Sequence, residues 1–256
     1  MNHTGLLIKC LNHFKIFILE ENLVENKSKN KVRAMFDSIA RNYDFLNHLL
    51  SLGIDVYWRR KLIFELKKYQ PANIIDIACG TADLSIMAAR NGFTNIIGVD
   101  LSSEMIKVGK EKVSKLNFQE KISLLEGDAE NLSFKENSFD AATIAYGVRN
   151  FENLQKGLLE ISRILKKGKP LLILEFSKPN NLIISWFYNI YSIVFIPVVG
   201  KLFSGNTNAY KYLPESIKDF PSGIDFLNIL KSCGFTSVRM QKLTFGISTL
   251  YIGEKV

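Results

Sequence analysis

The stretch Ile74-Ile75-Asp76-Ile77-Ala78-Cys79-Gly80-Thr81-Ala82 decides the fold class of this chain. It is an apolar run that leads into a glycine turn, a pattern typical of a buried strand in an α/β protein. In doubly wound sheets, ligands bind outside the carboxyl ends of the strands, and Gly80 allows a close approach of the backbone. The dinucleotide fingerprint G-x-G-x-x-G keeps only its first glycine here, which weakens the case for a nicotinamide cofactor.

The sequence on either side of this stretch alternates short apolar runs with segments of helical period. The expected strands are 74–78, 96–100, 122–125, 139–146 and 171–175, and the expected helices are 83–91, 103–116, 153–165 and 223–233. Apolar strands separated by such helices indicate a parallel sheet covered on both faces. Two β-rich runs at 237–243 and 248–254 predict a closing hairpin. We therefore predict an α/β fold with a doubly wound, mostly parallel sheet and a C-terminal antiparallel hairpin.

Composition sets broad limits on function. The chain has 256 residues, an apolar fraction of 47% and a charged fraction of 23%, which are ordinary values for a globular protein. The net charge of +8 favours acidic partners, namely nucleic acid, anionic lipid or phosphate-bearing ligands, without choosing among them. Three widely separated cysteines suit a reducing compartment, and no His/Cys cluster has zinc-ligand spacing, so we expect no metal.

Two segments lie outside this α/β pattern. Residues 1–30 are apolar with interspersed lysines and then polar, and we interpret them as a flexible extension, with an interfacial basic helix as the alternative. Residues 182–199 carry no charge and approach the length of a membrane span. Pro197 and a polar helical face argue against a span. We expect one domain over 31–256, with an apolar helical insertion at about 179–215.

Acidic residues recur at the carboxyl ends of successive predicted strands. Asp100 follows Gly80 by 100 − 80 = 20 residues, where a carboxylate accepts hydrogen bonds from ribose hydroxyls. Asp128 follows the next strand, where it can reach an adenine amino group. Either acid alone could be a helix cap or a turn former. Their recurrence at one edge of the sheet favours a nucleoside-containing ligand.

This arrangement resembles the class I S-adenosylmethionine-dependent methyltransferases, whose first motif matches from Ile74 to Gly80, with Ala82 in place of the last glycine. Longer motifs resemble the ubiquinone/menaquinone biosynthesis C-methyltransferases, and the resemblance runs from about residue 33 to the end. The motifs are Tyr43–Ser51 with Trp58, Tyr146–Asn150, Arg163–Ser177 and Tyr210–Ser216. The family usually has a histidine where this chain has Asp55, and a Lys-Pro-Gly-Gly turn where it has Lys166–Lys169.

The resemblance implies S-adenosylmethionine as cofactor, a Rossmann-like fold with a helical N-terminal cap, and C-methylation of a prenylated quinol. Demethylmenaquinol is the favoured substrate, because Leu52–Asp55 looks like the version found in menaquinone-only bacteria. The alternatives are the ubiquinone-pathway methoxybenzoquinol and another small phenol or lipid. The implied cofactor contacts are Asp76, Gly80, Thr81, Asp100, Asp128, Ala129 and Ala145. The implied substrate contacts are Tyr43, Asn47, Tyr146, Asn150 and Tyr210.

Methyl transfer to a quinol carbon needs an aligned acceptor and a stabilised phenolate, but no metal. Arg149 is the candidate catalytic residue, because a permanently charged guanidinium can stabilise the phenolate electrostatically. Pairing of Arg149 with a surface acid such as Glu152 is the alternative. His48 and Asp55 are weaker candidates for the base, since a lone histidine on an apolar helix face is more often a core residue.

Two other classes of function remain open at this point. One is a class I methyltransferase that acts on a soluble phenol, a sterol or tRNA, and the other is a non-catalytic nucleotide-binding or assembly protein. Dispersed basic residues, without interleaved aromatics, disfavour nucleic acid. The uncharged segment 182–199 suits a groove for a prenyl tail or a bilayer contact, with a buried helix pair as the alternative. We expect a cytoplasmic enzyme with peripheral contact at the inner face of the membrane, and leave homo-oligomer formation open.

Overall fold

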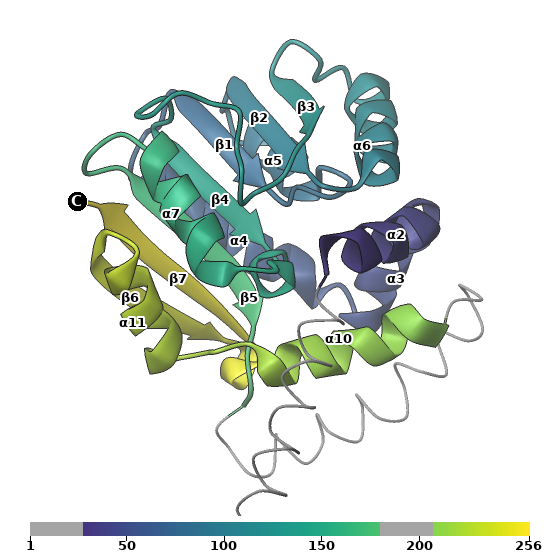
Figure 1. Cartoon of the computed structure of the whole chain (residues 1–256). Helices are drawn as coiled ribbons and strands as arrows, with labels where there is room; N and C mark the ends of the chain where they lie inside the picture. The colour runs from purple at the N-terminus through teal and green to yellow at the C-terminus, as the bar shows by residue number, and fades with distance from the viewer. Residues whose placement is uncertain (1–27, 180–206) are drawn as a thin grey trace, which may run out of the picture.

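The computed structural model describes residues 28–179 and 207–256, in which the opening apolar stretch forms the central strand β1 (Asn73–Ile77). The seven-stranded sheet has the order β3-β2-β1-β4-β5-β7-β6 (Figure 1). Strands β1 to β5 pair in parallel, whereas β7 pairs antiparallel with both β5 and β6. The predicted class and the C-terminal hairpin are thus confirmed. The other strands are β2 (Asn95–Asp100), β3 (Ile122–Glu126), β4 (Ala141–Ala145), β5 (Pro170–Phe176), β6 (Phe235–Leu243) and β7 (Ser248–Lys255).

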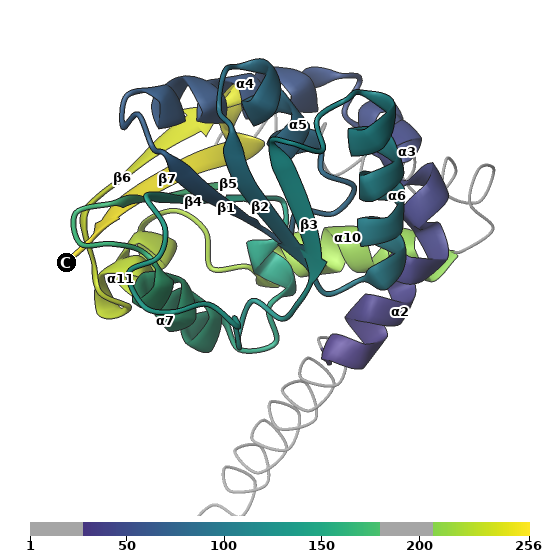
Figure 2. The ribbon, with the colours of Figure 1, turned by 90° about the horizontal axis from the view of Figure 1, so that it is seen from above.

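Helices cover both faces of the sheet, as Figure 2 shows from above. On one face lie α4 (Ile54–Lys67), α5 (Asp83–Arg90) and α6 (Ser103–Lys115), and on the other lie α7 (Leu154–Ile164) and α11 (Ile224–Ser232). Each face has its own apolar core, because strands buried on both sides present side chains alternately to the two helical layers.

The fourth strand is shorter than the sequence predicts, since β4 begins at Ala141 and not at Phe139. Phe139 forms an isolated bridge with Leu165 outside the sheet, and the Asp140 carboxylate accepts the backbone N–H of Asn73. At the other end, Tyr146 adopts a positive φ of 61°, which an extended strand does not tolerate. A tight turn therefore replaces the last predicted strand residue.

Short helices gather beyond the carboxyl ends of β1 to β5 (Figure 1). They are α2 (Lys29–Ile39), the 3-10 helix η1 (Ala40–Asn42), α3 (Tyr43–Leu50), the 3-10 helix η2 (Val148–Asn150) and α10 (Thr207–Asp219). A last 3-10 helix, η4 (Thr244–Gly246), connects β6 and β7. The helices α2, η1 and α3 form the expected N-terminal cap.

Two sequence predictions fall largely outside the described residues. The extension 1–30 is described only from residue 28, and the uncharged segment 182–199 is not described, so both interpretations stay predictions. The helix α10 lies at the end of the expected insertion 179–215. Among residues 28–179 and 207–256, no helix has both the length and the apolarity that a membrane crossing needs.

Candidate active site

The turn after β1 is built from residues with left-handed backbone. Ala78, Gly80 and Ala82 have φ values of 52°, 55° and 69°. Ala82 stands where the last family glycine is expected. It keeps the left-handed conformation, although this conformation costs an alanine more free energy than a glycine. A Cβ atom added to Gly80 would lie 3.8 Å from the ring of Tyr43. The turn is therefore covered directly by the first side chain of α3.

Asp100 closes β2 and is held by the turn after β1. Its Oδ2 accepts the backbone N–H of Gly80 at 2.8 Å, and its Oδ1 accepts that of Ser102 at 2.9 Å. Burial raises the pKa of the Asp100 carboxyl, while these two backbone hydrogen bonds oppose the shift. A carboxylate has about four acceptor positions on its two oxygens, so Asp100 keeps capacity for a further donor such as a ribose hydroxyl.

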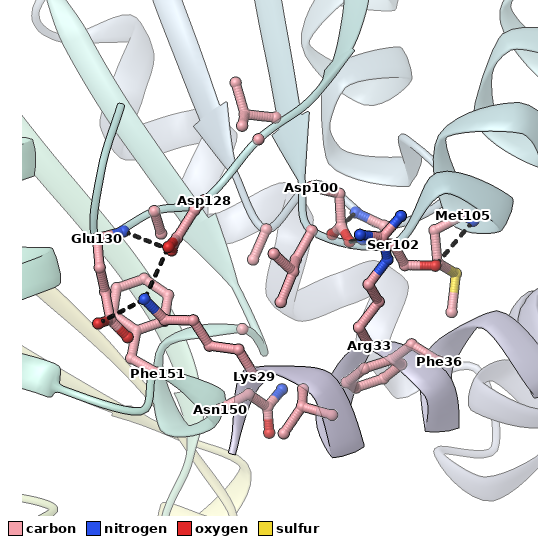
Figure 3. A pocket seen from close by; sticks show the side chains of 18 of the residues that line it. Lys29, Arg33, Phe36, Asp100, Ser102, Met105, Asp128, Glu130, Asn150 and Phe151 are labelled. Atoms are coloured by element: carbon pink, nitrogen blue, oxygen red, sulfur yellow. Dashed lines mark hydrogen bonds and ion pairs between the residues drawn. The ribbon is translucent and has the colours of Figure 1, made fainter. Parts of the chain in front are cut away.

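A cavity opens at this edge of the sheet and joins the ends of β1 to β4 to α2 (Figure 3). Eight of the residues expected at the site line it. They are Tyr43, Gly80, Asp100, Asp128, Ala129, Ala145, Tyr146 and Asn150. The topology explains this convergence, because the carboxyl ends of parallel strands meet at one edge of the sheet.

Asp128 is engaged by a lysine that the sequence did not reveal as a site residue. Lys29, at the start of α2, places its Nζ 2.7 Å from Asp128 Oδ2 and 2.9 Å from Glu130 Oε2 (Figure 3). The other oxygen of Asp128 accepts the backbone N–H of Glu130 at 2.9 Å. The sequence places Lys29 in a polar linker, and nothing local indicates that its partner follows β3.

The rest of α2 also contacts the region of the strand ends, through an ion pair and a hydrogen bond. Arg33 Nη2 lies 2.6 Å from Glu126 Oε1 at the end of β3. Asp37 accepts the Ser102 hydroxyl at 2.5 Å, and Ser102 in turn caps α6 by accepting the backbone N–H of Met105. These bonds make α2 one wall of the cavity.

Asp76 and Thr81, both expected to bind the cofactor, are not among the residues that line this cavity. Asp76 is 1% exposed and accepts hydrogen bonds from Ser85 at 2.6 Å and Thr143 at 3.0 Å. Burial raises the pKa of Asp76 to about 6. Thr81 is also buried, and its hydroxyl donates to Asp44. Both residues support the β1–α5 connection from behind the cavity wall.

Some of the expected substrate residues line the cavity and others do not. Tyr43, Tyr146 and Asn150 line the cavity, whereas Asn47 is not in its wall. Burial raises the pKa of the Tyr43 phenol, and a hydrogen bond with Asn47 opposes the shift. Asn150 accepts the hydroxyl of Tyr212, on α10, at 3.0 Å. The side chain of Tyr210, on the same helix, lies outside the described part of the structure.

Arg149 is buried and ion-paired, with 6% exposure, and it does not line the cavity. Its Nη1 lies 2.8 Å from Glu175 Oε1 and also donates to the carbonyl of Tyr146, and its Nε donates to the Ser216 hydroxyl at 3.3 Å. The partner is thus Glu175 and not the surface acid Glu152, because β4 and β5 are neighbours in the sheet. Through these three bonds, Arg149 connects the turn after β4 to the end of β5 and to α10.

A second polar cluster lies beside the ring of Tyr146. Asp55 pairs with Arg59, accepts the Ser51 hydroxyl at 2.5 Å, and lies 2.9 Å from His48 Nδ1. Burial alone would raise the pKa of Asp55, but these hydrogen bonds and the charge of Arg59 lower it. His48 has 42% side-chain exposure, so it is not the core residue considered above. The Arg59 guanidinium lies 5.5 Å from the ring centroid of Tyr146, which links this cluster to the cavity.

The fold is that of known methyltransferases. A SAM-dependent methyltransferase from Thermotoga maritima superimposes with a TM-score of 0.62 at 18% identity, over 88% of this chain and 99% of the other. The [4+2]-cyclase SpnF gives the same TM-score at 14% identity, over 89% of this chain and 97% of the other. At such identities the likeness shows the fold alone.

Sequence decides the family. The model of the ubiE/COQ5 methyltransferase family matches residues 24–255. The chain belongs to this family. A demethylmenaquinone methyltransferase from Bacteroides fragilis is 47% identical over 90% of this chain and 95% of its own length. A ubiquinone/menaquinone biosynthesis C-methyltransferase from Geotalea uraniireducens is 44% identical over 88% and 96%.

Membership of the ubiE/COQ5 family confirms three of the sequence predictions. The chain is a methyltransferase, its methyl donor is S-adenosylmethionine, and the motifs from residue 43 onward identify the family correctly. The carboxylates in the cavity fit this cofactor, because the oxygens of Asp100 can accept ribose hydroxyls and Asp128 can accept an adenine amino group. The positively charged Lys29 already lies on Asp128, so this carboxylate is shared with α2.

Proposed function

We propose that this chain methylates the ring carbon of demethylmenaquinol. The observation that supports this most is the convergence of Gly80, Asp100 and Asp128 on one cavity, in a chain 47% identical to a demethylmenaquinone methyltransferase. Several relatives are named for both quinone pathways, so methylation of the ubiquinone-pathway quinol is the second candidate.

S-adenosylmethionine brings a methyl group already activated at its sulfonium. The protein then has to hold the donor and acceptor in line and favour the phenolate form of the quinol. We assign the cofactor contacts to Gly80, Asp100, Asp128, Ala129 and Ala145, which line the cavity. Asp76 and Thr81 hold the β1–α5 turn in position from behind.

The acceptor is assigned to the side of the cavity formed by Tyr43, Tyr146 and Asn150. Arg149 acts there as a positioning residue, since it binds the Tyr146 carbonyl and lies in the same 3-10 helix as Asn150. Its positive charge reaches the buried phenol of Tyr43 and lowers the pKa of that group, against the larger effect of burial. The same field would favour ionisation of a quinol hydroxyl placed beside Tyr43.

The remaining partners follow from the substrate. A prenylated quinol resides in a membrane, so we assign the enzyme to the cytoplasm, in peripheral contact with the inner face of the membrane. Asn47 and Tyr210 stay candidate substrate contacts. A role of 182–199 in holding the prenyl tail and the formation of a homo-oligomer also stay predictions from the sequence.

The quinone profile of cells tests the proposal directly. Cells that lack the protein should accumulate demethylmenaquinone and lose menaquinone, and the wild-type gene should restore menaquinone. Restoration should fail with Asp100→Ala. Accumulation of a ubiquinone precursor alone would establish the second candidate, and an unchanged profile of both quinones would contradict the proposal.

A further inference from the structure

The outer face of α4 exposes aromatic side chains that the catalytic cavity does not use. Tyr57 and Phe64 are seven residues apart, so they point the same way, and they are 48% and 61% exposed. Phe245, in η4, is 76% exposed. Large exposed aromatics on neighbouring elements are characteristic of an interaction surface.

Basic residues surround these rings on the same helical face, contrary to the dispersed basic residues without interleaved aromatics expected from the sequence. Arg60, Lys61, Lys67 and Lys68 fall with Tyr57 and Phe64 within an arc of roughly 120°, since successive residues turn by about 100°. The Lys61 Nζ lies 5.5 Å from the ring centroid of Tyr57, and the Lys68 Nζ lies 5.0 Å from that of Phe64. The opposite arc, which includes Trp58, Leu62 and Leu66, is buried against the sheet.

The acids of α4 leave this face positive. Asp55 is buried and paired with Arg59. Glu65 lies 2.5 Å from Lys68 Nζ and 3.5 Å from Arg239 Nη2, so one carboxylate is shared by two cations. Four basic residues against this single shared carboxylate give the face complementarity to an acidic partner.

The connection between β6 and β7 lies beside α4, next to Trp58. Trp58 Nε1 donates to Thr244 Oγ1 at 2.8 Å, which fixes η4 beside α4. Figure 2 shows α4 along the outer edge of the molecule, with the ends of β6 and β7 next to it. We call the following residues of this outward face the α4 surface: Tyr57, Arg60, Lys61, Phe64, Lys67 and Lys68.

We propose that the α4 surface docks on an anionic lipid bilayer. Aromatic rings prefer the headgroup level, and lysines bind anionic headgroups while their alkyl stems cover apolar surface. The lysine ammonium groups lie over one face of each of the Tyr57 and Phe64 rings, which leaves less of these rings for stacking with nucleic acid bases. The inference extends the proposed function, since a prenylated quinol must be taken from a bilayer, but its evidence is the surface itself.

Sedimentation of the full chain with vesicles tests this inference. The wild-type chain should bind vesicles of phosphatidylglycerol and phosphatidylcholine more tightly than vesicles of phosphatidylcholine alone. The variant Lys61→Gln/Lys68→Gln should bind the anionic vesicles roughly 25-fold more weakly, because each basic residue near such a surface contributes about fivefold. The variant Tyr57→Ser/Phe64→Ser should weaken binding about tenfold, through loss of apolar contact.

A matched control lies on the other face of the sheet. Ile224, at the start of α11, is 68% exposed, and Lys231 is an exposed lysine of the same helix. The variant Ile224→Ser/Lys231→Gln should bind vesicles as the wild type does. Methylation of a short-tailed quinol in solution should continue in every variant, so failure of the proposed function would be recognised separately.

Three results would overturn the inference. They are absence of wild-type binding to anionic vesicles, retention of full binding by both α4 variants, and an equal loss in the α11 control. Binding of single-stranded RNA that the lysine variant loses while vesicle binding persists would assign the α4 surface to nucleic acid instead. Thermal unfolding should confirm that each variant is folded.

Discussion

Lys29 Nζ lies 2.7 Å from Asp128 Oδ2, so a cation of the N-terminal helix α2 is bound to the acid that follows β3. Burial alone would lower the pKa of Lys29, but hydrogen bonds to Asp128 and Glu130 outweigh it and raise the pKa. The lysine therefore stays charged at neutral pH. Because we propose that Asp128 also accepts the adenine amino group of the cofactor, we expect the two donors to compete for the same carboxylate.

Replacement of this lysine tests the competition. Lys29→Gln should raise the affinity for S-adenosylmethionine by up to about fivefold, the usual limit for a partly exposed ion pair. Isothermal titration calorimetry measures the change, and Lys110→Gln, at an exposed position of α6, is a control with the same loss of charge. A lower affinity in Lys29→Gln alone would show that Lys29 contributes to binding and does not compete.

Asp100 is expected to matter most for cofactor affinity. Asp100→Ala should weaken binding of S-adenosylmethionine about ten- to hundredfold, because a hydrogen bond to a charged group contributes about 1.5–3 kcal/mol. Asp140→Ala is the matched control, since Asp140 also accepts a backbone N–H but lies at the amino end of β1. Equal affinities of the two folded variants would remove Asp100 from the cofactor site.

The raised pKa of Asp76 should make the free energy of unfolding depend on pH. Burial raises its pKa in the folded chain to about 6, from an ordinary value of 3.8, so the folded state binds the extra proton. The contribution of Asp76 is therefore fully present below about pH 4 and is lost as the pH rises through about 6, by up to about 3 kcal/mol. Relative to wild type, Asp76→Asn should gain stability over this interval, as measured by urea unfolding.

Asp140 is the control for this titration, because its pKa is shifted in the opposite direction. Burial alone would raise the pKa of Asp140, but a hydrogen bond from Lys166 helps to lower it below the ordinary value of 3.8. Asp140 therefore stabilises the fold above its unfolded pKa and loses this contribution as the pH falls through the lower, folded value. Asp140→Asn should thus lose stability at neutral pH. An Asp76→Asn variant whose stability parallels wild type from pH 4 to 7 would contradict the assignment.

These residues also show how far the sequence alone could lead. The glycine turn, Asp100 and Asp128 were predictable, because each follows an apolar strand and parallel strands end at one edge. Lys29 was not, since its partner Asp128 is 99 residues away and the segment around it is polar. Glu175 was recognised as part of a motif, but its pairing with Arg149 depends on the adjacency of β4 and β5, which only the strand order reveals.

The burial of individual site residues was also not predictable from the local sequence. Asp76 and Thr81 belong to the motif around Gly80, yet both side chains turn away from the cavity into the protein. In a strand, neighbouring side chains point to opposite faces, and the sequence does not show which acid of a motif reaches the ligand.

Replacement of Arg149 tests whether this residue positions the side of the cavity assigned to the acceptor. Arg149→Lys keeps the charge but loses the planar guanidinium, whose Nη1 binds Glu175 and the Tyr146 carbonyl while its Nε binds Ser216, so kcat should fall about a hundredfold. The pH of half-maximal kcat should rise, because the phenolate is less well stabilised, while cofactor affinity should stay near the wild-type value. Arg163→Lys is the control, since Arg163 pairs with Glu160 on the remote helix α7. A change confined to cofactor affinity, or to thermal stability, would contradict this role.

Methyl transfer in a defined mixture tests the central claim most directly. The purified chain is incubated anaerobically with demethylmenaquinone and S-adenosylmethionine carrying a deuterated methyl group, with and without a chemical reductant, and the products are analysed by mass spectrometry. The account predicts menaquinone with the intact deuterated methyl group on its ring carbon, formed only when the substrate is reduced to the quinol. An O-methylated product, no product, or equal rates with quinone and quinol would contradict it.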